Sequence, residues 1–158
     1  MSITYFVYII FLLRVIAWIV VLIVILKTIK NMSTVTSAAE LGRKVNNGEN
    51  EITIEGDLGK KTIRIKATGK VAWAIAFGAI GVALVIAIRG VGAGPAAPAL
   101  EAIAITSAGG AVAVIGLPAT VAALSMAFAV KNKNVLKSLR DDYIIVSKTN
   151  NRVVLKRK

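Results

Sequence analysis

The sequence contains no cysteine and no histidine, and only eight of its 158 residues are acidic. These absences exclude disulfide bonds, catalysis by a thiol or an imidazole, and zinc sites built from Cys or His ligands. The apolar stretches also contain no Asp, Lys or His that could hydrolyse a substrate inside a membrane. We therefore expect no catalytic residues, no metal and no cofactor, and an enzyme is the least favoured class of protein.

What the chain has instead is long apolar stretches, which contribute to a hydrophobic content of 56%. Residues 3–26, 71–88 and 109–130 contain a single charge between them, Arg14. A hydrocarbon core about 30 Å thick is crossed by roughly 20 apolar residues in a helix. The sequence therefore predicts an α-helical membrane protein with three transmembrane helices, at residues 1–26, 71–89 and 109–130.

The first apolar stretch resembles a secretion signal in its position. It lacks basic residues before it and a small-residue cleavage site after it, so we interpret it as a retained helix.

Positive charge gives the expected orientation of these helices. The chain carries 20 Lys and Arg against its eight acids, a net charge of +12, and residues 27–70 and 131–158 hold nine cations each. Basic loops stay on the cytoplasmic side, so we expect a cell-membrane protein with its amino terminus outside and its carboxyl terminus inside. Residues 90–108 then form an outer Gly/Ala/Pro connection that could re-enter the bilayer. Anionic headgroups are the expected partner of the cations, and direct nucleic-acid binding is not favoured.

Residues 27–70 predict a short helix followed by a β-hairpin. Ser37 and Glu40 have the spacing of a capping box, which starts a helix. Apolar and polar residues then alternate through 52–55 and 62–66 on both sides of a turn at 56–59, which is typical of two paired strands.

Residues 131–158 repeat this design. Residues 131–142 predict a helical extension of the third span, with a thin apolar stripe. A second hairpin follows, in which Ile144 and Val146 face Val153 and Leu155. Because a lone hairpin is marginally stable in water, we expect the two hairpins to form one small antiparallel β module, and its small size favours a homo-oligomer.

Three charges in or beside the apolar stretches are candidate pore residues. Arg14 costs about 2.5–3.5 kcal/mol at the middle of a membrane helix. It could therefore line a cavity, pair with Glu101, reach the interface, or bind backbone carbonyls. Arg89 and Glu101 bracket the outer connection. A ring of Glu101 in an oligomer would favour cations in a pore, whereas its place near a helix start explains it without any such role.

Small residues and proline mark candidate packing and gating positions. Ala74 and Gly78 are four residues apart, a spacing that lets membrane helices approach closely within one chain or between subunits. Pro118 is expected to bend the third helix beside Gly116, and Thr120 could bind a carbonyl that this proline leaves free. The glycines of 90–94 lack the Lys and Ser or Thr of a phosphate loop, so no nucleotide site is expected there.

The basic residues of the cytoplasmic module are expected to bind an anion or lipid headgroups. The candidates are Lys60, Lys61, Arg64, Lys66, Arg152 and Lys156, within a wider group that includes Arg43, Lys44, Lys70, Arg157 and Lys158.

Two functions follow as hypotheses. The first is a homo-oligomeric membrane pore or ion channel, with a membrane-disrupting effector of lysis or defence as its setting and the basic β module as its control. The second is a non-catalytic membrane scaffold or small subunit, whose basic sheet docks a protein partner, an anionic lipid or a nucleotide ligand.

Overall fold

The computed structural model describes residues 12–25, 34–90 and 97–158. The chain divides into two compact units, residues 1–33 and 34–158, which are described separately. In the first unit the structure describes one apolar helix, Leu12–Ile25, which carries Arg14. The rest of the predicted first span, residues 1–11 and 26, lies outside the described residues.

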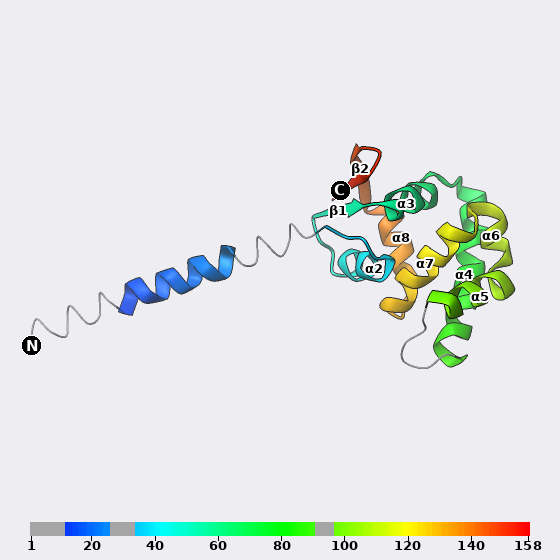
Figure 1. The fold of residues 1–158 in the computed structure, drawn as a ribbon, viewed down its shortest axis with the longest axis horizontal. Helices are drawn as coiled ribbons and strands as arrows, with labels where there is room; N and C mark the ends of the chain where they lie inside the picture. Colours follow the sequence, from blue (N-terminus) through cyan, green and yellow to red (C-terminus); the bar gives the residue numbers. More distant parts are fainter. Residues whose placement is uncertain (1–11, 26–33, 91–96) are drawn as a thin grey trace, which may run out of the picture. The chain divides into compact units, whose positions relative to one another are not determined.

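The second unit contains a bundle of helices and a small sheet. Its elements are α2 (Ala38–Asn46), β1 (Glu51–Glu55), α3 (Asp57–Ala67), α4 (Lys70–Gly90), α5 (Ala97–Ser107), α6 (Gly109–Ile115), α7 (Leu117–Ala129), α8 (Asn134–Asp141), β2 (Tyr143–Lys148) and β3 (Arg152–Arg157). In this unit α4, α5 and α6 lie on one side and the sheet on the other, with α7 between them (Figure 1). Helix α7 contacts every other helix from α2 to α8.

The expected fold class, with three transmembrane helices, is wrong. Among the described residues, α4 alone is long and apolar enough to cross a membrane, and the helix Leu12–Ile25 and α7 are both shorter. The α5–α6 pair reaches the necessary length only if its two helices count as one, and they meet at an angle of 96°.

The predicted third span, residues 109–130, is broken at Gly116. This residue has a φ of +83°, a conformation that favours glycine, and it separates α6 from α7. Pro118 lies in the first turn of α7, where its missing amide costs nothing. It therefore helps to start a new helix rather than bend a continuous one. Apolar residues of α7, such as Ala123 and Met126, are buried inside the unit, so this apolar stretch forms the core.

The first predicted hairpin is also wrong, because its second strand is the helix α3. Strand β1 ends at Glu55, and Gly56, with a φ of +73°, turns the chain into the helix. Leu58, Thr62 and Ile65 are buried at spacings of four and three residues, which is the period of a helix. The alternation of apolar and polar residues around Ile65, which predicted a strand, was therefore a weaker signal than the helical spacing of the buried residues.

The sheet has three antiparallel strands in the order β1-β3-β2. Residues from both predicted segments do join in one sheet, and the second hairpin is confirmed as β2 and β3. Its register differs from the expected one, because Leu155 lies opposite Ile145 and the pairing shifts between Ile145 and Ser147. As a result, Ile144 and Val146 are exposed by 45% and 57% instead of facing the core.

Helices α2 and α8 lie close to their predicted positions. Helix α2 follows Ser37, although the Ser37 side chain makes no capping hydrogen bond. Helix α8 does not continue α7, because Lys131 has a φ of 53° between the two helices. The predicted apolar stripe of α8 is confirmed, and Leu136 and Leu139 are fully buried.

Candidate functional site

A cationic groove lies between α4 and α8, with a volume of about 670 Å³. We call it the basic groove, and its lining residues are Lys66, Lys70, Trp73, Ala74, Phe77, Lys137, Arg140, Asp141 and Lys158. Five of these residues are cations and only Asp141 is an acid, so the groove is strongly positive.

One wall of the basic groove is aromatic. Trp73 and Phe77 are four residues apart on α4 and therefore share one face, with their ring centroids 5.8 Å apart. Cations of the α8 segment cover this wall. The Arg140 guanidinium lies 5.1 Å from the Trp73 ring centroid, and the Lys133 Nζ lies 4.9 Å from that of Phe77. Such cation–π contacts hold the cations beside an apolar surface.

Two of the cations are fixed by backbone carbonyls, because α3 and α8 cap each other. The Lys66 Nζ donates hydrogen bonds to the carbonyls of Leu139, Arg140 and Tyr143, at 2.7, 3.1 and 2.6 Å. The Arg140 guanidinium donates in return to the carbonyls of Ile65, at 3.1 Å, and Thr68. Cations are favoured at the carboxyl end of a helix, where carbonyls lack partners. These contacts make the floor of the groove rigid.

The surroundings of Lys66 show that positive charge is concentrated here. Burial, together with the nearby charges of Lys158 and Arg140, lowers the pKa of Lys66 to about 8. Asp141 opposes this change but does not cancel it. The groove therefore lacks the negative charge that would balance its cations.

The other three cations of the groove, Lys70, Lys137 and Lys158, are exposed. The ion pairs in the described part of the chain join Lys44 to Glu49, Lys61 to Asp57, and Arg152 to Glu55. None of these pairs includes a residue of the basic groove. Lys70, Lys137 and Lys158 thus line the groove without forming an ion pair with a carboxylate of the described residues.

The anion-binding residues predicted from sequence are separated in the structure. Lys60 and Arg152 line a hollow of about 310 Å³, whereas Lys61 lies in another groove and Lys66 in the basic groove. Arg64 lies beside Gly116, and Lys156 is exposed on β3. The reason is that α3 is a helix, so successive side chains point in directions about 100° apart.

The predicted pore charges are not brought together within the second unit. Arg89 is exposed near the end of α4, and Arg14 belongs to the first unit. Glu101 lines a groove of about 680 Å³ that also contains Glu55 and Asp57. These last two carboxylates already form ion pairs, and the described residues contain no cluster of acids that could hold a metal ion.

The predicted packing residues of α4 lie on its uncovered side. Ala74 lines the basic groove, and a Cβ added to Gly78 would meet no atom within 4 Å. At the predicted gate, the Thr120 Oγ1 donates a 2.9 Å hydrogen bond to the Gly116 carbonyl, while Pro118 is exposed. Neither Ala74 nor Gly78 therefore supports close helix packing within the described unit.

Helix α4 also presents an apolar face that the described residues leave uncovered. Val71, Ile75, Val82, Val85 and Ile86 are exposed by 80%, 55%, 57%, 48% and 42%. Only 28% of the most apolar stretch of α4 is buried, so α4 differs from the core helix of a soluble domain. At 100° per residue these side chains lie beside the face that lines the basic groove. An apolar surface and a cationic groove are therefore neighbours on one helix.

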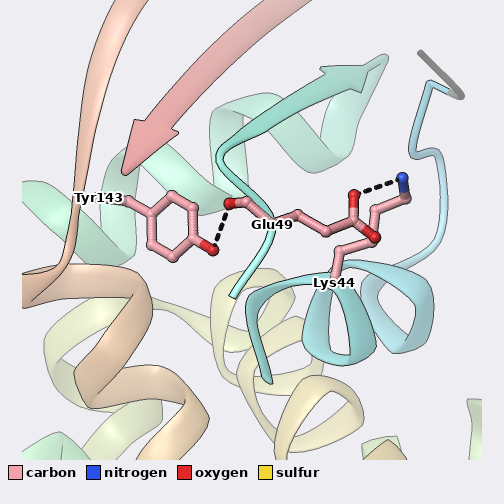
Figure 2. Close-up of polar contacts among 3 residues, drawn as sticks. All are labelled: Lys44, Glu49 and Tyr143. Atoms are coloured by element: carbon pink, nitrogen blue, oxygen red, sulfur yellow. Dashed lines mark hydrogen bonds and ion pairs between the residues drawn. The ribbon is translucent and has the colours of Figure 1, made fainter. Parts of the chain in front are cut away.

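A separate polar network ties α2 to the sheet (Figure 2). The buried Lys44 Nζ contacts the Glu49 Oε2 at 2.9 Å, and the Tyr143 hydroxyl donates a 2.7 Å hydrogen bond to the Glu49 carbonyl. Burial raises the pKa of Tyr143, an effect that Arg157 partly offsets. Every group in this network has a partner, and its role is to hold the fold.

Replacing Tyr143 by Phe tests that structural role. The substitution removes the hydroxyl from the part-buried Glu49 carbonyl, and we expect the free energy of unfolding to fall by about 1–2 kcal/mol. Chemical denaturation in detergent micelles would measure it. As a control, Thr106→Val removes an exposed 2.9 Å hydrogen bond to the Ala102 carbonyl, which water can replace. Equal losses in the two variants would contradict the role given to Tyr143.

Sequence reasoning missed two of the five cations of the basic groove. Lys66, Lys70 and Lys158 were among the expected anion-binding cations, but Lys137 and Arg140 were not. A usable signal was present, because Lys133, Lys137 and Arg140 follow one another at the spacing of a helix face. Which helix would lie opposite this face could not be known from the sequence.

Comparison of the chain with protein families, with curated proteins and with solved structures finds no match.

Proposed function

We propose that this chain is a non-catalytic, lipid-binding membrane protein. In this proposal the exposed face of α4 lies against hydrocarbon, and the basic groove lies at the level of anionic headgroups. The observation that carries the proposal is the uncovered apolar face, because five large aliphatic side chains follow one another along α4. A contiguous surface of this kind marks a site of contact with a membrane or another protein.

The energies involved favour a membrane as the covering surface. Removing a Val or Ile side chain from water stabilises the buried state by about 1.5–3 kcal/mol. Exposed cations close to an anionic membrane each add about 1 kcal/mol. Lys70, Lys137 and Lys158 stand beside the apolar face, so both contributions act on the same side of the unit.

The cations along α8 favour an orientation in which α4 lies along the membrane surface. Arg140 and Lys133 cover α4 from Trp73 to Gly81, a length of about 12 Å, and the Lys133 Nζ lies 3.1 Å from a Cβ added to Gly81. If α4 crossed the bilayer upright, these two cations would enter hydrocarbon. A helix lying in the interface keeps them among the headgroups.

A fluorescent label tests the proposed contact. Because the chain has no cysteine, Val85→Cys gives a single site for a polarity-sensitive dye. We expect the emission of this dye to shift to the blue and to brighten when vesicles are added. Val146→Cys is the matched control, since Val146 is also an exposed valine but lies on β2. An unchanged spectrum at position 85 would refute the proposal.

A homo-oligomeric membrane pore is the other function predicted from the sequence. Its simplest test is current through planar bilayers, where Glu101→Lys should reverse a preference for cations if Glu101 lines the conducting path.

A further inference from the structure

We infer that the basic groove is a binding site for a single anionic glycerophospholipid, with the phosphate between Lys70, Lys137 and Lys158 and the acyl chain against the α4 wall beside Trp73 and Phe77. This inference rests on the proposed function and deepens it, because it assigns a particular lipid class to a particular groove. The chemistry that it requires is a negative phosphate joined to a hydrocarbon chain.

The two walls of the groove match the two ends of such a molecule. The α4 wall offers Trp73 and Phe77, which are half-buried and stand 5.8 Å apart. Helix α8 offers the ammonium of Lys137, and its Arg140 guanidinium lies over the Trp73 ring, 5.1 Å from the ring centroid. An inorganic anion such as phosphate would use the cationic wall alone and would leave the aromatic wall without a partner.

The cations of the groove divide into fixed and free groups. Lys66 and Arg140 already donate to backbone carbonyls, so they supply a positive field without moving. Lys70, Lys137 and Lys158 are exposed and pair with no carboxylate among the described residues, so they can close on a phosphate. The volume of about 670 Å³ also falls within the range of about 300–1,000 Å³ that is usual for small-ligand sites.

The position of the groove supports a lipid rather than a free phosphate compound. Its α4 wall is adjacent to the exposed face that carries Ile75 and Val82. A lipid in the surrounding bilayer could therefore enter sideways and keep its second chain in hydrocarbon. Trp73 would lie near the glycerol backbone, the depth at which tryptophan is enriched in membrane proteins.

Quenching of Trp73 fluorescence by brominated lipid tests this inference directly. The full chain with Trp18→Phe retains Trp73 as its only tryptophan. It is placed in vesicles of phosphatidylcholine with a minority of phosphatidylglycerol. Bromine is carried on the acyl chains of the phosphatidylglycerol in one preparation and of the phosphatidylcholine in the other. The two quenching values together give the preference of the site for the anionic lipid.

We expect brominated phosphatidylglycerol to quench Trp73 well beyond its share of the lipid. Each lysine that contacts the phosphate should contribute about a fivefold preference. The variant Lys70→Gln/Lys137→Gln/Lys158→Gln should lose this preference. The matched control Lys60→Gln/Lys148→Gln/Lys156→Gln removes the same charge from exposed lysines outside the groove, and it should retain the preference.

The possible outcomes separate this inference from the proposed function. Quenching by each lipid in proportion to its share of the bilayer, or equal loss of preference in both triple variants, would overturn the groove as a lipid site. The proposed contact of α4 with the bilayer would then still stand, because Trp73 is quenched by lipid. Absence of quenching by either brominated lipid would overturn both proposals.

Discussion

Replacing Val82 and Ile86 together by lysine is expected to remove α4 from the bilayer. Both side chains belong to the exposed face of α4. Because they are 57% and 42% exposed, covering each of them stabilises the bound state by about half of the 1.5–3 kcal/mol that a fully exposed side chain would gain. The double variant should therefore lose roughly 1.5–3 kcal/mol, which lowers the equilibrium constant for membrane contact by about tenfold to a hundredfold. A polarity-sensitive dye on Val85→Cys, added to each variant, reports the loss as an emission spectrum that vesicles no longer change.

The control for this prediction is the same chemical change on the sheet. Ile144 and Val146 are exposed aliphatic residues of β2, and Ile144→Lys/Val146→Lys adds two identical charges there. We expect this variant to behave as the parent chain does at position 85. A dye at position 85 that still enters the hydrocarbon with lysine at 82 and 86 would contradict the place given to the α4 face.

The second large effect is expected at the crossing of α2 and α7. An added Cβ at Gly42 would stand 2.5 Å from the carbonyl oxygen and 2.8 Å from the Cα of Met126, which are backbone atoms that cannot rotate away. Gly42→Ala should lower the free energy of unfolding by about 3 kcal/mol, at the upper end of the usual cost of overpacking. Equilibrium unfolding in denaturant, followed by circular dichroism in micelles, would measure this loss.

Gly78→Ala is the matched control, and it has the opposite expected sign. An added Cβ meets no atom within 4 Å at this position of α4, so alanine should gain up to about 1 kcal/mol from its better helix propensity. If Gly78→Ala instead weakened an oligomer of the full chain, a second copy would lie against Gly78, as the sequence hypothesis of small-residue packing allows. Equal effects at Gly42 and Gly78 would contradict the close crossing of α2 with α7.

The local elements of this fold were more predictable from sequence than the way its apolar stretches pack. The Ser37–Glu40 spacing and the alternation after residue 143 predicted the positions of α2 and of the β2–β3 hairpin, although Ser37 makes no capping hydrogen bond and alternation failed at α3. Hydropathy failed over residues 109–130, because an apolar helix that forms a protein core has the same composition as one that faces lipid. The break at Gly116 depends on a backbone angle that a hydropathy window cannot detect.

The candidate site shows the same limit. Lys66 and Lys70 indicated from the sequence that cations gather near the start of the second apolar stretch. The sequence did not indicate that α8 brings Lys137 and Arg140 to the side of Trp73. This arrangement depends on the turn at Lys131 and on the hydrogen bonds by which α3 and α8 cap each other, and these hydrogen bonds join residues more than 70 positions apart. Charge composition therefore indicated an anionic partner, but only the three-dimensional packing places an aromatic wall beside the cations.

The depth of labels along α4 tests the central claim most directly. Single cysteines at Ile75, Val82 and Ile86 would each carry a fluorophore, and quenching by nitroxides at different depths in the lipid would locate each one in the bilayer. The account predicts that all three labels lie at similar, shallow depths just below the headgroups, while a label at Val146 is not quenched. Depths that change steadily from Ile75 to Ile86 would show a crossing helix, and no quenching at any of the three positions would show that α4 does not contact the bilayer.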